Sequence, residues 1–185
     1  MDRLEHDFGD HSAIIYMYFD YKEQGVHKLT NVLGSILKQI CQAFKPGLLP
    51  NEIRRDLSVL TTKIRTRQVD LKDYTQLIVQ SMESFARVFL IFDALDEYGS
   101  DGARQELLRT VEELQHGGTN IHVLITCRPH ISVDLFFASS NSIEIRAHDS
   151  DLELLIRAKL SAYSHISANL KEDILIELMS MANGT

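Results

Sequence analysis

The sequence predicts an α/β fold with a mainly parallel sheet, because strand-like and helix-like segments alternate along the chain as far as residue 148. Continuous apolar runs at 13–19, 88–92 and 121–126 are typical of strands that are buried on both faces. Between these runs, apolar residues recur every three or four positions, which is the spacing of amphipathic helices. Residues 149–185 show the helical spacing alone. We therefore expect a parallel sheet followed by a helical segment.

The predicted elements follow one another in chain order. They are a strand at 13–19, helices at 26–44, 53–64 and 71–85, a strand at 88–92, a helix at 107–114, a strand at 121–126, a short helix at 133–138 and a fourth strand at 142–145. Asp70 is placed to cap the third helix, and Gly117 with Gly118 is placed to end the fourth. Two further helices are expected to begin at the capping residues Ser150 and Asn169.

The composition is that of an ordinary globular protein. Of 185 residues, 44% are hydrophobic, and the net charge of -7 argues against a dedicated nucleic-acid binder, which would be basic. No apolar run approaches the ~20 residues that span a bilayer, and the acidic start has no signal-peptide pattern. We expect a cytoplasmic protein. Cys41 and Cys127 lack metal-type spacing, so reduced, buried thiols are expected rather than a disulfide or a zinc site.

The apolar run at 88–92 delivers three carboxylates, Asp93, Asp96 and Glu97, to the end of one predicted strand. This is the pattern of a Walker B magnesium site. Magnesium keeps most of its water ligands and takes one or two carboxylates, so Asp93 is the expected metal ligand. Asp96 or Glu97 would then orient or deprotonate the attacking water, and the spacing does not decide between them. The alternative is that the acids form a solvated turn or cap the next helix.

The strand at 121–126 ends in Cys127-Arg128-Pro129, which places a positive charge beside those acids if the two strands are neighbours. We then expect the carboxylates of Asp93 and Glu97 to lie within one side-chain reach of Arg128, which would contact a terminal phosphate. The alternative is that Arg128 merely neutralises the acids. No glycine in the chain is followed by lysine, so the G-x-x-x-x-G-K-[ST] phosphate loop is not in this sequence.

The order of these motifs resembles a NACHT domain, and most closely the nephrocystin-3-like NACHT proteins of fungi, which belong to the STAND class of P-loop NTPases. The resemblance implies a signal-transducing ATPase that uses Mg²⁺ with ATP or ADP to switch a larger protein between closed and oligomeric forms. By position, Asp93 resembles the magnesium aspartate of that family and Arg128 its sensor arginine. Asp96 and Glu97 resemble its acidic pair.

The resemblance also divides the chain into a partial nucleotide-binding domain at 1–148, without the phosphate loop, and the beginning of a helical lid at 149–185. It implies a P-loop NTPase sheet without its first strand. Three strands would remain paired, with 121–126 at an open edge unless 142–145 covers it.

We therefore expect this chain alone to bind neither magnesium nor nucleotide and not to hydrolyse ATP. Two non-catalytic alternatives are a fragment that docks onto full-length NACHT proteins, and an incomplete gene product without a role of its own. Self-association through the edge at 121–126 is also expected, because unpaired strands invite pairing.

Overall fold

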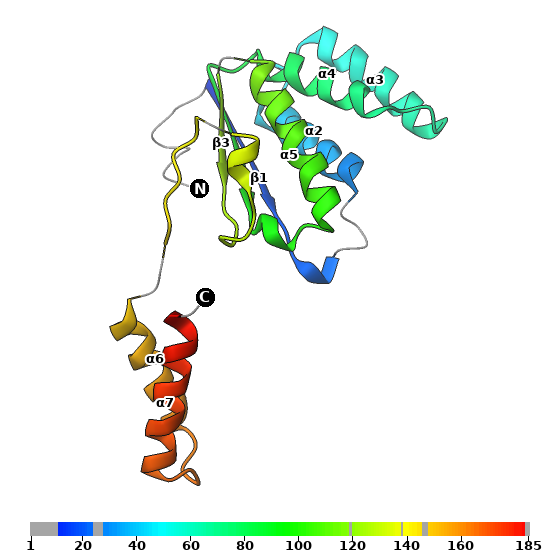
Figure 1. The fold of residues 1–185 in the computed structure, drawn as a ribbon. Helices are drawn as coiled ribbons and strands as arrows, with labels where there is room; N and C mark the ends of the chain where they lie inside the picture. Colours follow the sequence, from blue (N-terminus) through cyan, green and yellow to red (C-terminus); the bar gives the residue numbers. More distant parts are fainter. Residues whose placement is uncertain (1–10, 24–27, 119, 138, 146–147, 184–185) are drawn as a thin grey trace. The chain divides into compact units, whose positions relative to one another are not determined.

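A computed structural model describes residues 11–23, 28–118, 120–137, 139–145 and 148–183. The contacts between Cα atoms divide the chain into two compact units, Met1–Ser140 and Asn141–Thr185. The first unit contains the sheet, and the second contains a pair of helices (Figure 1). None of the helices in the described part of the chain is long and apolar enough to cross a membrane.

The sheet consists of three parallel strands: β1 (Ser12–Tyr18), β2 (Arg87–Asp93) and β3 (Ile121–Ile125). Their order in space is β1-β2-β3, so β2 is the central strand. The register places Ile15 beside Leu90, and Leu90 beside Val123. This arrangement confirms the α/β class and the pairing of the first three predicted strands.

The helices of the first unit connect these strands. They are α2 (Leu29–Ala43), α3 (Asn51–Arg65), α4 (Leu71–Met82) and α5 (Asp101–His116), with single turns η2 (Tyr21–Glu23), η3 (Leu95–Glu97) and η4 (Val133–Leu135). Asp70 caps α4 in a capping box with Asp73, as the sequence indicates. Ser100 caps α5 through its side chain, and Gly117 follows the last residue of that helix.

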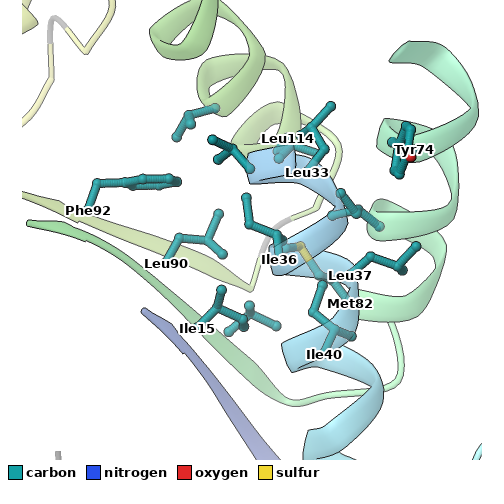
Figure 2. Packing of buried hydrophobic residues seen from close by; sticks show 14 of the residues in the cluster. Ile15, Leu33, Ile36, Leu37, Ile40, Tyr74, Met82, Leu90, Phe92 and Leu114 are labelled. Carbon is teal, nitrogen blue, oxygen red and sulfur yellow. The ribbon is translucent and has the colours of Figure 1, made fainter. Parts of the chain in front are cut away.

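Helices cover the sheet in two successive layers. α2 packs against β1 and α5 against β3, while α4 packs on α2 and α3 packs on α4 (Figure 1). The sheet contributes Ile15, Leu90 and Phe92 to the core, and α2 contributes Leu33 and Ile36 (Figure 2). Each of these five side chains is at most 1% exposed. Burial of each stabilises the fold by about 1.5–3 kcal/mol, so this interface contributes substantially to stability.

The predicted strand at 142–145 is absent from the sheet, which corrects the sequence interpretation. Ile143 is 84% exposed and Ile145 is 91% exposed, and the segment belongs to the second unit. Alternating apolar residues favour extended backbone, but a strand also requires a ladder partner. The sequence pattern identified the local preference and could not show whether that partner exists.

The second unit contains α6 (Asp149–Ser161) and α7 (Ala168–Asn183), which contact each other. Both begin one or two residues earlier than the sequence suggested. α6 follows His148 without a side-chain cap, so the expected capping box at Ser150 does not form. At α7 the hydroxyl of Ser167, rather than Asn169, accepts an N–H of the first turn, that of Leu170, at 3.3 Å.

Candidate functional site

The carboxyl ends of β2 and β3 bring the predicted site residues to one edge of the sheet. Asp93 is the last residue of β2, and the turn η3 holds Asp96 and Glu97 directly after it. Arg128 follows β3 by three residues. Because parallel strands end at the same edge, acids and arginine from distant parts of the sequence are neighbours here.

Two hydroxyl groups from the neighbouring strands hold the Asp93 carboxylate. The phenol of Tyr16, on β1, donates to Asp93 Oδ2 at 2.8 Å. The hydroxyl of Thr126, at the end of β3, donates to Oδ1. The Thr126 bond and then the Tyr16 bond lower the pKa of Asp93, because both stabilise the charged form. The same bond raises the pKa of Tyr16. Asp93 is therefore an ionised acceptor at neutral pH.

We predict that Tyr16→Phe raises the pKa of Asp93 towards its ordinary value, because one donor to the carboxylate is lost. Because folding lowers the pKa of this carboxyl group, the ionised carboxylate stabilises the fold at pH values above its unfolded-state pKa. That stabilisation is lost as the pH falls through the folded-state pKa. The variant should therefore lose stability at neutral pH and less in strong acid. A ¹³C titration of the Asp93 carboxyl carbon measures the pKa, with Tyr18→Phe as control. An unchanged Asp93 pKa in Tyr16→Phe would contradict the assignment.

Arg128 forms its ion pair with Asp96. The guanidinium Nε lies 3.0 Å from Asp96 Oδ2, and the Arg128 main-chain N–H donates to Oδ1 at 3.3 Å. The Asp96 side chain is 10% exposed, whereas that of Arg128 is 69% exposed. The expectation that Asp93 and Glu97 lie within one side-chain reach of Arg128 stays a prediction, whereas the ion pair itself is formed with Asp96. In the turn, the Leu95 N–H donates to the Thr126 carbonyl at 2.9 Å, which joins η3 to the end of β3.

Glu97 has a separate partner on the opposite side of β2. Its Oε2 accepts the main-chain N–H of Tyr21, just beyond β1, at 3.0 Å. The three acids therefore have three different sets of partners: hydroxyl groups for Asp93, the arginine for Asp96 and a main-chain N–H for Glu97. Among the residues that the structure describes, only Oε2 of Glu97 has such a partner.

Sequence reasoning missed Arg104, which organises the loop that carries the acids. Its guanidinium Nη1 donates to the carbonyls of Asp96, Tyr98 and Gly99 at 3.1, 3.0 and 2.9 Å. Nη2 pairs with Asp101, and the Arg104 side chain is 14% exposed. Nothing in the spacing of Arg104 marks this role, because its acceptors are main-chain carbonyls. Tyr16 was missed as well, since it lies within an apolar run.

Ala94 adopts left-handed backbone geometry, with φ 57° and ψ 47°, at the point where β2 turns into η3. This conformation costs an L-residue roughly 1–2 kcal/mol, and glycine avoids the cost. We predict that Ala94→Gly raises the free energy of unfolding by about 0.5–1 kcal/mol, less than the full relief because glycine gains entropy when unfolded. Urea denaturation measures this. Ala103→Gly, in the first turn of α5, is the control and should be destabilising. If Ala94→Gly lowered the free energy of unfolding, the inference that Ala94 is strained would be contradicted.

The described residues contain no group of three or more histidine, cysteine or acidic side chains that could hold a metal ion. A magnesium ion at Asp93 would therefore rely on water and on a ligand such as phosphate for its other positions. Both cysteines are free, and burial raises the pKa of the Cys41 and Cys127 thiols. Neither thiol has the lowered pKa of a nucleophile.

A shallow hollow lies between α3 and α4, lined among others by Asp56, Lys63 and Asp73. Its lining residues do not include Asp93, Asp96, Glu97 or Arg128. Lys63 and Asp73 form an ion pair there, and Asp73 also completes the capping box of α4. These groups are accounted for by helix capping and pairing, so the candidate site remains the edge at Asp93.

Comparison with known proteins gives one match. Residues 1–128 match the model of a protein family described as "Nephrocystin 3, N-terminal". The match covers the whole sheet and ends at Arg128. No curated protein and no solved structure matches the chain.

Proposed function

The chain belongs to the nephrocystin 3 N-terminal family, and from this premise we propose that it is part of a NACHT-type signal-transducing ATPase. The proposal includes membership of the STAND class of P-loop NTPases and likeness to the fungal members of that class. In such a protein this chain would supply the magnesium-binding and phosphate-sensing edge of the sheet. Its helices α6 and α7 would begin the lid.

The observation that carries the proposal is the convergence of Asp93, Asp96, Glu97 and Arg128 at the carboxyl ends of two adjacent parallel strands. Ligands of open α/β sheets bind at this edge. Asp93 fits a magnesium ligand because it is ionised and because hydroxyl groups hold it in place. These hydroxyl groups compete only weakly with a cation for the carboxylate oxygens. The cation would bring the negative phosphates to an edge that is otherwise acidic.

The contacts of the three acids suggest which role each of them has in nucleotide binding and hydrolysis. Both oxygens of Asp96 are engaged by Arg128, so Asp96 would hold the arginine while no terminal phosphate is present. A phosphate near Arg128 would compete with Asp96 for the guanidinium, which makes the arginine responsive to that phosphate. Within the described part of the chain no partner is found for the other oxygen of Glu97, Oε1, so Glu97 is the better candidate to orient water. Asp93 would remain the magnesium ligand throughout.

The experiment supplies the missing loop. The chain is extended at its N-terminus with the strand, G-x-x-x-x-G-K-[ST] loop and helix of a family relative, and ATP with magnesium is titrated into it calorimetrically. We expect affinity in the micromolar range, about 8 kcal/mol of binding free energy. Asp93→Asn should weaken binding by roughly tenfold or more, because a charged metal ligand is lost. Asp134→Asn, an exposed acid on η4, is the control.

For the 185-residue chain itself we predict ATP binding no tighter than about millimolar, roughly 4 kcal/mol. The reason is that main-chain N–H groups and the lysine of the phosphate loop supply most phosphate contacts, and no glycine here is followed by lysine. Steady-state hydrolysis should be undetectable. Micromolar affinity that is lost on Asp93→Asn would contradict this prediction, since the strand ends would then suffice.

A non-catalytic role in docking onto full-length NACHT proteins is the second candidate. The observation that favours it is that all three acids already have protein partners. The test is co-purification of the tagged chain with a full-length family member that carries its own phosphate loop. Binding that is unaffected by Asp93→Asn would favour docking over a catalytic role for this edge.

A further inference from the structure

Helix α3 is the outermost helix of the first unit, because α4 and α2 lie between it and the sheet (Figure 1). Its inner side packs through Ile53 and Leu60, which are buried. Its outer side is polar and exposed. At about 3.6 residues per turn, one third of the helix surface consists of Asn51, Arg54, Arg55, Ser58, Thr61, Thr62 and Arg65, each of which is exposed. We call these residues the outer face of α3.

The outer face of α3 is positively charged in a chain whose net charge is -7. It carries three arginines and no carboxylate, because the two acids of the helix, Glu52 and Asp56, lie outside it. In the part of the chain that the structure describes, none of these arginines forms an ion pair. Three guanidinium groups are therefore available to an anionic partner.

Hydroxyl groups lie between the arginines of this face. Ser58, Thr61 and Thr62 donate to main-chain carbonyls one turn earlier, at 3.1, 2.7 and 3.0 Å. Those carbonyls also accept helix N–H groups, so a hydroxyl that turns outward leaves no carbonyl without a partner. Arginine, serine, threonine and asparagine are among the side chains that contact phosphates in protein–DNA complexes. The composition of the outer face therefore matches a sugar–phosphate backbone.

The same composition disfavours other anionic partners. The outer face, which the structure describes in full, has no apolar side chain, whereas membrane-bound helices insert an apolar face and protein interfaces have an apolar centre. It also has no aromatic side chain on which the bases of a single strand could stack. The major groove of double-stranded RNA is too narrow for side chains to read, whereas that of DNA, about 12 Å wide, admits a helix. Duplex DNA therefore fits this face best.

We propose that the outer face of α3 binds the phosphate backbone of duplex DNA, with the helix tilted across the major groove and without preference for base sequence. Arg54 and Arg65 lie about 16 Å apart along the helix axis, so they can reach the two strands that border the groove. Arg55 adds a contact beside Arg54. The acidic remainder of the chain repels DNA, so binding is weak and depends strongly on salt. None of these residues lies at the edge of Asp93, so the proposal does not rest on the ATPase proposal.

The test is fluorescence anisotropy of a labelled DNA duplex, titrated with the full chain at several salt concentrations. We expect a dissociation constant of about 10–100 μM at low salt, and an association constant whose logarithm falls with that of the salt concentration with a slope of about -3. Arg54→Gln and Arg65→Gln should each make the slope shallower by about 1 and weaken binding roughly threefold or more. Arg109→Gln, the same change at an exposed position of α5, should alter neither quantity.

Circular dichroism checks that each variant is folded. Equal affinity for A·T-rich and G·C-rich duplexes is expected, because phosphate contacts carry no sequence information. The proposal would be overturned by a lack of binding at low salt, by an unchanged slope in both arginine variants, or by tighter binding of RNA or of single-stranded DNA. Equal binding to poly-glutamate or to vesicles that contain phosphatidylserine would also overturn it, because the face would then suit an acidic protein or a membrane.

Discussion

Leu90→Ala should lower the free energy of unfolding of the first unit by about 3 kcal/mol, because it leaves a cavity in the core. Leu90 is fully buried on the central strand and faces α2 (Figure 2). The matched control is Leu124→Ala on the adjacent strand, where the leucine is 57% exposed. The control should cost less than about 1 kcal/mol.

Urea denaturation followed by far-ultraviolet circular dichroism measures both variants, since the chain has no tryptophan to serve as a fluorescent probe. Similar losses for Leu90→Ala and Leu124→Ala would show that the sheet buries its two faces equally. That result would contradict the packing of α2 on this face of the sheet.

Arg104→Met is expected to cost about 3 kcal/mol, because three carbonyls of the acid-bearing loop lose a charged donor that is largely buried. Methionine keeps most of the side-chain length, so the loss comes from hydrogen bonds and charge rather than from volume. Arg109→Met, at an exposed position of the same helix, is the control and should change stability by less than about 0.5 kcal/mol.

The same variant tests the connection between the loop and the site. With its carbonyls released, the loop should no longer hold Asp96 beside Arg128, and amide exchange at Asp96 and Tyr98 should accelerate. A stable Arg104→Met protein with unchanged exchange in this loop would mean that the carbonyls find other donors, and that Arg104 does not position the acids.

The strands at 88–92 and 121–126 could be predicted from their continuous apolar runs. Their expected burial on both faces was wrong for 121–126, because Leu124 lies on the face that the helices do not cover and is 57% exposed. The segment 142–145 shows the limit of that reasoning. Its alternating isoleucines indicate extended backbone, but pairing depends on a neighbour that local sequence does not specify.

The site residues could be assigned to one edge from their positions after strands, and the structure brings them there. Their partners could not be assigned. The Asp96–Arg128 pair depends on the left-handed turn at Ala94, which an alanine does not indicate. The Tyr16–Asp93 bond depends on the register between β1 and β2, which is set by packing across the whole sheet.

The most direct test of the magnesium role of Asp93 uses Mn²⁺ in place of Mg²⁺, with ADP, on the chain extended by a relative's phosphate loop. The account predicts that the carboxyl ¹³C resonance of Asp93 is broadened beyond detection, because the ion would lie against that group and paramagnetic broadening falls steeply with distance. The resonance of Glu52, on α3, which packs on α4, should stay sharp. A sharp Asp93 resonance, with nucleotide and metal shown to be bound, would contradict the account.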